Sequence, residues 1–197
     1  MCSPFGGKLP PWRPATRLEG DEENHEPSGL PRSALRPRPI PYMQSEMVFA
    51  QSIVSQAEQK QVNTRTRSGD ISIALSAATR PLEKTVIEDA GSLLVPHHDG
   101  AVCRIESYQS PKSVQPGEAY IPSMILDFER VITAFPVLKL ESAAGCDIRM
   151  GYAERLIDGA FNNALECPFA DSYITREGYQ EWQPSYWRAF RYLKIQF

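Results

Sequence analysis

The sequence has no excess of basic residues and no long apolar run. Its 21 basic side chains stand against 24 acidic ones, a formal net charge of -3. Nucleic-acid binding is not expected, because no surplus of positive charge is available to neutralise phosphates. No stretch approaches the roughly 18 apolar residues that suggest a membrane-spanning helix. The opening residues, MCSPFGGKLPPW, lack the apolar segment of a secretory signal. These absences favour a cytoplasmic protein with no membrane partner.

Cysteine and histidine are also scarce, at four and three residues. The cysteines form no C-x-x-C pair, so free thiols are expected rather than a zinc site or a disulfide framework. His97, His98 and Asp99 superficially resemble a set of metal ligands. Adjacent residues of an extended segment point to opposite sides, so the two histidines are poorly placed to share one ion. An exposed polar turn is the better interpretation, and neither a metal nor a cofactor is expected.

Proline, in contrast, is abundant at the start of the chain. Nine of the 17 prolines precede residue 42, in segments such as KLPPWRPA and RPRPIPY. Proline lacks the N–H that helices and central strands need. Residues 1–45 are therefore predicted to be an extended linker, and residues 46–197 a folded module.

Short apolar runs separated by turn residues characterise this predicted module. Between residues 46 and 120, the segments MVFAQSIVSQ, ISIALSAA, KTVIEDA and AVCRIESY are candidate strands, whereas AEQKQ could equally form a short helix. From residue 120 the pattern becomes regular. Ile148, Met150 and Tyr152 alternate with polar or small residues, as in a half-buried antiparallel strand. Short strands without a long helix predict an all-β fold, an antiparallel β-sandwich of the jelly-roll or concanavalin-like kind.

Four segments of the last third carry a family resemblance. LDFERVITAFPVLKLESAAG, GYAERLIDGAFNN, ADSYITREG and YWRAFRYLKIQF occur in the order found in bacterial α-L-rhamnosidases of glycoside hydrolase family 78. The chain resembles the concanavalin-like module that precedes the catalytic barrel in that family. GLPRSALRPRPIPYM is similar to the family's linker, and LPPWRPA to the tail of an upstream β-domain. The resemblance is strongest after residue 125.

The chain departs from the family pattern at three positions. Glu129, Ala134 and Ala189 stand where the resembled family usually has glycine. Glycine at such points permits a positive φ or a close backbone approach. Strain or a different local turn is therefore expected at these positions. Such losses also fit a degenerate gene fragment without a function, which is one alternative interpretation of the chain.

The resemblance implies a parent glycosidase but transfers no catalytic residue. Inverting glycosidases need a carboxylic acid and a carboxylate base on either side of the scissile bond. In the resembled family both acids belong to a helical (α/α) barrel, which is expected to lie beyond this sequence, as a following domain or a separate chain. The module is thus expected to be inactive alone and to support that barrel. The spacing of Asp127, Glu154 and Asp158 does not indicate an acid–base pair.

A stand-alone carbohydrate-binding module is the other alternative, with rhamnosides as ligands. Trp182, Tyr186 and Trp187 lie close together in EWQPSYWRAF, and aromatic rings stack on the apolar faces of sugars. The same residues could equally belong to the core of the sandwich or to an interface with the barrel.

Arg191 is expected to take part in a structural ion pair. It shares the alternation of Leu193 and Ile195, which predicts a place on the buried face of the last strand. A buried guanidinium needs a carboxylate or carbonyl partner. Asp127 or Glu154 is predicted to supply it.

Overall fold

The computed structural model describes residues 39–62, 68–94, 102–107, 119–164 and 169–197. The chain divides into two compact units, residues 1–46 and residues 47–197. In the first unit, residues 39–46 form no helix or strand and are exposed; Pro39 and Pro41 lack the N–H that either element needs. Residues 1–38 of the predicted linker, and the group His97, His98 and Asp99, lie outside the described residues. No described helix is long and apolar enough to cross a membrane.

Strands make up about half of the described residues of the second unit. Three main strands, β5 (Tyr120–Ala134), β7 (Asp147–Ala153) and β10 (Arg188–Gln196), lie in the part with the regular sequence pattern. One α-helix, α1 (Ser68–Leu75), and a 3-10 turn, η1 (Ala90–Leu94), accompany the strands. The remaining strands are β1 (Ser52–Lys60), β2 (Thr79–Arg80), β3 (Thr85–Glu88), β4 (Arg104–Ser107), β6 (Leu138–Ser142), β8 (Ala170–Ile174) and β9 (Gly178–Trp182).

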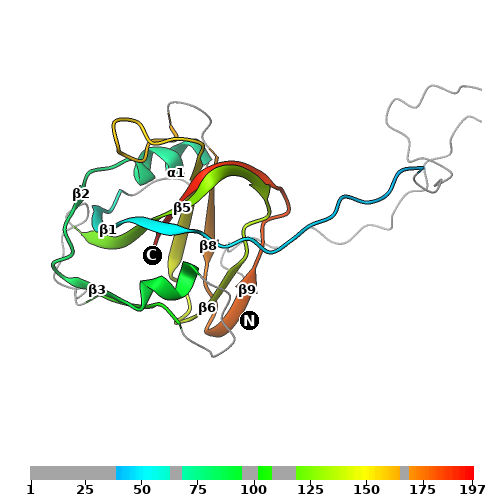
Figure 1. The fold of residues 1–197 in the computed structure, drawn as a ribbon. Helices are drawn as coiled ribbons and strands as arrows, with labels where there is room; N and C mark the ends of the chain where they lie inside the picture. The colour runs from blue at the N-terminus through cyan, green and yellow to red at the C-terminus, as the bar shows by residue number, and fades with distance from the viewer. Residues whose placement is uncertain (1–38, 63–67, 95–101, 108–118, 165–168) are drawn as a thin grey trace, which may run out of the picture. The chain divides into compact units, whose positions relative to one another are not determined.

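One antiparallel sheet of six strands forms the centre of this unit, in the order β2-β1-β5-β10-β7-β8. Two smaller antiparallel pairs, β3-β4 and β6-β9, complete the described strands. Figure 1 shows α1 on one side of the large sheet, with β3, β6 and β9 on the other. The predicted all-β, sandwich-like architecture is confirmed.

Each face of the large sheet has its own apolar core. On the side of the smaller strand pairs, Met124, Met150 and Leu193 pack with partly buried Leu140 and Trp182. On the side of α1, Ile71 and Leu75 pack against inward residues of the sheet: Ile125, Ala153 and Tyr192. The alternation read from the sequence is confirmed in β7, because Ile148, Met150 and Tyr152 share the first core.

One local prediction was wrong, and one open alternative is settled. ISIALSAA contains most of α1 rather than a strand, because Ile71, Ala74 and Leu75 lie at the i, i+3 and i+4 positions of one helical face, which is buried. Ile73, which a strand would have placed beside Ile71, is exposed. AEQKQ is no helix either, since residues 57–60 of it belong to β1.

Polar side chains of the sheet hold the C-terminal end of α1. The amide of Gln59 donates to the carbonyl of Leu75 at 2.8 Å and to that of Ala77 at 2.8 Å. The ammonium of Lys194 donates to the same Leu75 carbonyl, also at 2.8 Å. These bonds satisfy carbonyls that have no partner within the helix. The short helix is therefore fixed to the sheet at its end as well as along its apolar face.

We expect Gly151→Ala to destabilise the protein by about 1–2 kcal/mol. A Cβ at this position of β7 would lie 2.7 Å from Leu75 Cδ1 and 3.1 Å from Phe161 Cε1, so α1 or the Phe161 ring must shift. Chemical denaturation measures the change in unfolding free energy. Gly69→Ala is the matched control, because its Cβ would meet nothing within 4 Å. Equal stabilities of the two variants would contradict the close packing of α1 on β7.

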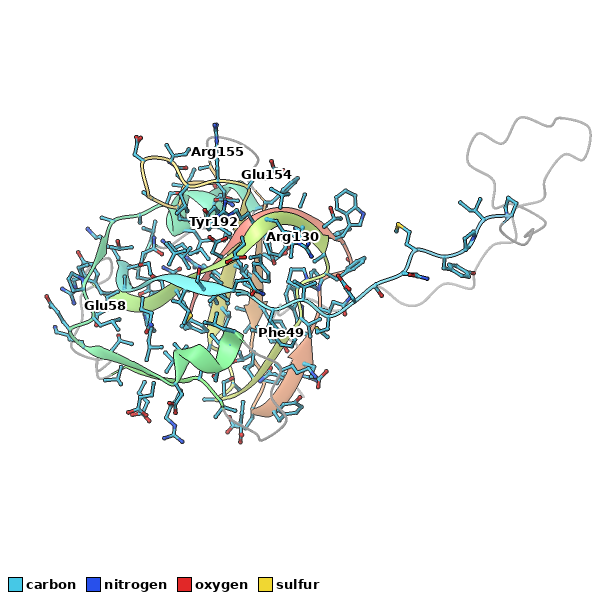
Figure 2. The ribbon with its side chains drawn as sticks, viewed as in Figure 1. Phe49, Glu58, Arg130, Glu154, Arg155 and Tyr192 are labelled. Atoms are coloured by element: carbon cyan, nitrogen blue, oxygen red, sulfur yellow. The ribbon has the colours of Figure 1, made fainter. Side chains whose placement is uncertain are left out.

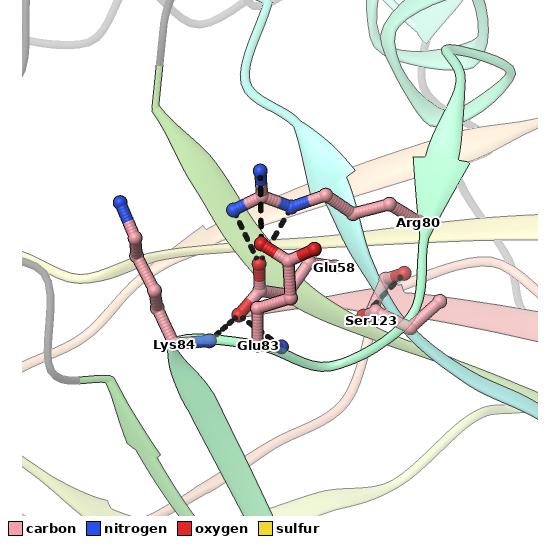
Figure 3. A network of polar contacts seen from close by, with 6 residues as sticks. Glu58, Arg80, Glu83, Lys84 and Ser123 are labelled. Carbon is pink, nitrogen blue, oxygen red and sulfur yellow. Dashed lines mark hydrogen bonds and ion pairs between the residues drawn. The ribbon is translucent and has the colours of Figure 1, made fainter.

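A buried carboxylate joins β1 to the segment that leads into β3 (Figure 3). Glu58 has a fully buried side chain, and its carboxylate pairs with Nη2 of Arg80 at 2.7 Å. The backbone amides of Glu83 and Lys84 donate to its other oxygen. Burial acts to raise the pKa of Glu58, but these bonds outweigh it and hold the pKa below its ordinary value. The guanidinium of Arg80 also lies over the ring of Tyr120, 3.8 Å from its centroid.

The pairing of β5 with β10 changes register in the middle of both strands. Tyr192 is opposite Asp127, but Phe190 is opposite Ile132, so four residues of β5 face the single residue Arg191. Glu129 lies within this irregularity and has a φ of 62°. Figure 1 shows both strands curving together away from the sheet. The predicted strain at Glu129 is confirmed as a left-handed backbone, whereas Ala134 and Ala189 do not have a positive φ.

We expect Glu129→Gly to stabilise the protein by about 0.5–1 kcal/mol, because glycine adopts a positive φ without a Cβ clash. Thermal and chemical denaturation measure the gain. Arg130→Gly is the control, since Arg130 is the next residue, is also exposed and has no positive φ. That variant should lose stability. A loss for Glu129→Gly as well would show that the backbone there is not strained.

Candidate functional site

The three aromatic residues predicted as a sugar platform do not share one surface. Trp182 ends β9, opposite Leu138 of β6, and is packed against the apolar core. Its ring lies 5.4 Å from that of Tyr173. In the part of the chain that the structure describes, no ring contact joins Trp182 to Tyr186 or Trp187. Trp182 thus packs between the β6-β9 pair and the large sheet.

Tyr186 and Trp187 are both exposed, by 65% and 58%, just before β10 begins. The ring of Tyr186 lies beside the guanidinium of Arg188, 5.4 Å from its centroid. Adjacent side chains of an extended segment point to opposite sides, so Trp187 faces away from Arg188. The structure therefore separates the two: Tyr186 flanks Arg188, and Trp187 lies on the outer side of the strand.

Arg188 forms the centre of a polar and aromatic cluster. Its Nη2 donates to Oδ1 of Asp171 on β8, at 2.8 Å, and both side chains are largely buried, 13% and 16% exposed. The rings of Tyr152 and Phe169 each have their centroid 5.6 Å from the guanidinium. Together with Tyr186, three rings surround this charge-assisted pair. We call the five residues the Arg188 cluster.

Two polar atoms of this cluster are buried without a hydrogen-bond partner, Nε of Arg188 and Oδ2 of Asp171. Burial, the negative charge of Asp171 and a hydrogen bond to Asp171 together raise the pKa of Tyr152 well above its ordinary value, so its hydroxyl keeps its proton. The cluster thus holds one donor and one acceptor that no described residue uses.

The structure brings Arg191 and Asp127 together at the change of register. Nε and Nη2 of Arg191 donate to the two carboxylate oxygens of Asp127, at 2.8 and 2.9 Å. Bonding from Arg191 is the main reason why the pKa of Asp127 lies below its ordinary value. Glu154 has no contact with this pair: it is exposed, beyond the end of β7 and next to Arg155 (Figure 2).

The buried position predicted for Arg191 was wrong, because its side chain is 37% exposed. The change of register at Arg191 alters the alternation of β10, so that Phe190 and Leu193, three residues apart, both lie in one core. Asp127 is engaged with Arg191 and held in its charged form. It has the surroundings of a structural carboxylate rather than of a general acid.

The described residues contain no group of three or more histidine, cysteine or acidic side chains that could hold a metal. Cys103 and Cys146 are free thiols, as predicted. Burial, with the charge of Asp89 adding to it, raises the pKa of Cys103, which disfavours the reactive thiolate.

The second half of β5 and the start of β10 present an exposed apolar face. Ala134 is opposite Arg188 and Ala189 is opposite Thr133, and the inward residues Ile132 and Phe190 reach the core. Val131, Phe135 and Trp187 belong to the opposite, outward side by alternation, and all three are exposed. We call these three residues the outer ribbon face. Exposed apolar patches of this kind often mark contact surfaces.

Arg188 and Asp171 were not predicted as site residues from the sequence. A signal for Asp171 was present. In the predicted strand ADSYI, Asp171 and its neighbour Ser172 point to opposite faces. For Arg188 the signal was the basic residue among aromatic ones in SYWRAF. Their pairing joins residues 17 apart in sequence and depends on sheet order, which no local pattern gives.

Comparisons with known proteins find a similarity over the last part of the chain. A family model for the bacterial alpha-L-rhamnosidase concanavalin-like domain matches residues 120–197. No curated protein matches the chain. The α-L-rhamnosidase from Dictyoglumus thermophilum is similar with 29% identity over 38% of this chain and 9% of its own, and a TM-score of 0.35. The GH78 family rhamnosidase of Bacillus sp. GL1 shares 19% identity over 64% of this chain and 10% of its own, with a TM-score of 0.38.

The chain therefore spans about a tenth of either enzyme, 9% and 10% of their lengths. The assignment depends on the matched residues, which include β5, β7 and β10, three strands of the large sheet. Residues 120–197 are therefore similar to the concanavalin-like domain of bacterial alpha-L-rhamnosidases.

Proposed function

We propose that this chain is a non-catalytic accessory module of an α-L-rhamnosidase-type glycoside hydrolase, which packs against the catalytic domain and supports it. The family match over residues 120–197 carries this proposal. Asp127, the most buried of the carboxylates nominated from the sequence, is engaged in an ion pair with Arg191. The contribution of the module is accordingly structural.

The outer ribbon face is the surface that we assign to this contact. Val131, Phe135 and Trp187 expose apolar area to water on a two-stranded ribbon whose other side is fixed in the core. Burying such area against a partner is favourable by roughly 25 cal/mol per Å². Tryptophan is also enriched among residues that dominate binding energy at interfaces. Trp187, which the sequence suggested as a sugar ligand, is thus assigned to the domain contact.

A chimeric enzyme tests this proposal. Residues 120–197 would replace the matched segment of the Dictyoglumus thermophilum α-L-rhamnosidase, and hydrolysis of an aryl α-L-rhamnoside and the melting temperature would be measured. We expect the chimera to be active and the isolated chain to be inactive. Phe135→Ser with Trp187→Ser should lower the melting temperature and activity of the chimera.

Tyr179→Ser is the control, because Tyr179 is an exposed aromatic residue like Trp187, 65% against 58%, but lies on β9 and not on the outer ribbon face. It should leave the chimera unchanged. Hydrolysis by the isolated chain would refute the non-catalytic role. A chimera that is active and indifferent to the Phe135 and Trp187 substitutions would refute the assigned contact surface.

Carbohydrate contact is a second candidate function. The observation that favours it is the exposed ring of Tyr186 beside the polar Arg188 and Asp171 pair. Sugar sites commonly combine an aromatic face with a few converging polar groups. Trp182 and Trp187 take no part in this second function.

A further inference from the structure

We propose that the Arg188 cluster binds a vicinal diol of a pyranoside, with Asp171 and Arg188 contacting the hydroxyls and Tyr186 contacting the apolar face of the ring. The choice of a rhamnoside as the first probe rests on the proposed function. The diol chemistry itself is inferred from the residues of the cluster.

The hydrogen-bonding groups of the cluster match a diol. Asp171 Oδ2 is an acceptor and Arg188 Nε a donor, and neither has a partner, although the two side chains are already joined through Oδ1 and Nη2. One hydroxyl of a vicinal diol can donate to the carboxylate while its neighbour accepts from the guanidinium. Hydrogen bonds to charged groups are the stronger ones, so two such bonds provide affinity as well as orientation.

The aromatic residues provide the apolar part of the site. Tyr186 lies beside the guanidinium and is 65% exposed, whereas Tyr152 lies beneath and is fully buried. Phe169, also exposed, borders the cluster from the start of β8. A pyranoside that places two hydroxyls on the ion pair can lay its C–H face against Tyr186. The combination of charged pair and exposed ring suits a sugar better than an inorganic anion, which the carboxylate of Asp171 would repel.

Access to the polar atoms depends on Tyr186. The unpartnered atoms of Asp171 and Arg188 are buried, although 16% and 13% of the two side chains stay exposed, and Tyr186 belongs to no strand. Its ring makes no ring–ring contact among the described residues, so a turn of its side chain loses no core packing. The ion pair itself stays in place, because β8 and β10 are both held by β7.

Titration of the ¹⁵N-labelled full chain tests the site. Methyl α-L-rhamnopyranoside and methyl α-D-glucopyranoside are the probes, and amide chemical shifts are the readout. We expect saturable shifts for the rhamnoside, confined to residues around Asp171, Tyr186 and Arg188. Asp171→Asn and Tyr186→Ala should each weaken the affinity about tenfold, which is the effect of losing one good polar or stacking contact.

Tyr179→Ala is the matched control, since Tyr179 and Tyr186 are equally exposed, at 65%, and Tyr179 lies outside the cluster. Its affinity should equal that of the natural sequence. Shifts elsewhere in the protein, no saturable shifts with either sugar, or full affinity in a folded Asp171→Asn variant would each overturn the site. Because the map is recorded on the natural sequence, an unstable variant does not prevent this test.

The two proposals fail in different ways. If the chimeric enzyme behaves as expected while neither sugar binds, the diol site is wrong and the accessory function stands. If sugars bind but the chimera is inactive, the site stands without the proposed function. Equal affinity for both sugars would support the diol site and contradict a preference for rhamnosides.

Discussion

Replacing Glu58 by alanine is expected to lower the unfolding free energy by about 3 kcal/mol. The carboxylate is fully buried and satisfies Arg80 and two backbone amides at once. Its removal leaves a partly buried guanidinium without its best partner and two amides without acceptors. Chemical denaturation at neutral pH measures the loss.

Glu83→Ala is the matched control for this effect. Glu83 contacts the same Arg80, at 3.4 Å, but its side chain is exposed. Exposed pairs contribute little, so a change below about 0.5 kcal/mol is expected. Because the native pKa of Glu58 lies below its ordinary value, the contribution of the carboxylate is complete above pH 4.5. It should fade as the pH falls further. Equal losses for the two variants would contradict the central role of Glu58.

Lys194→Met is expected to stabilise the protein at neutral pH and to lose this advantage in alkali. Lys194 is buried, and its ammonium donates to the Leu75 carbonyl. Burial lowers its pKa from 10.5 to about 8. The unfolded chain therefore binds the proton more tightly than the native protein does. Lys194 therefore destabilises the native protein at pH values below about 8. This destabilisation disappears as the pH rises toward 10.5.

The stability difference between Lys194→Met and the natural sequence should therefore shrink by roughly 3 kcal/mol between neutral pH and pH 10.5. Comparing the two proteins at each pH removes the titration of other groups. Gln59 still donates to the Leu75 carbonyl in the variant, so α1 keeps a bond there. Lys60→Met, at an exposed position of β1, controls for the loss of a positive charge. A pH-independent difference would contradict the effect of burial.

Period-two alternation predicted the sheet well where strands are long and one face is apolar. β7 follows it throughout, and β5 follows it from Met124 to Phe128. The prediction for Arg191 failed because the register shift at that residue is a property of two strands together. The one local indication of this irregularity was Glu129, at a position where the resembled family usually has glycine. In the structure Glu129 has a positive φ.

The candidate site was harder to predict than the fold. Neighbours in sequence suggested one aromatic platform, but Trp182 is packed against the core at the end of β9, whereas Tyr186 and Trp187 are exposed just before β10. The polar half of the Arg188 cluster comes from β8, whose place beside β7 no local pattern reveals. The helix α1 was missed for a different reason: its eight residues are too few to distinguish helical from strand periodicity.

The strand order has a consequence for how the protein is made. β10 is the last of the described strands in the sequence, yet it lies between β5 and β7. During synthesis, β5 and β7 must leave the ribosome with an open edge each, and they stay so until residues 188–196 emerge to fill the gap. A ribosome that pauses or stops before this point would release a nascent chain with two open edges. Open edges are templates for pairing with other chains, so we expect such a nascent chain to be prone to aggregation.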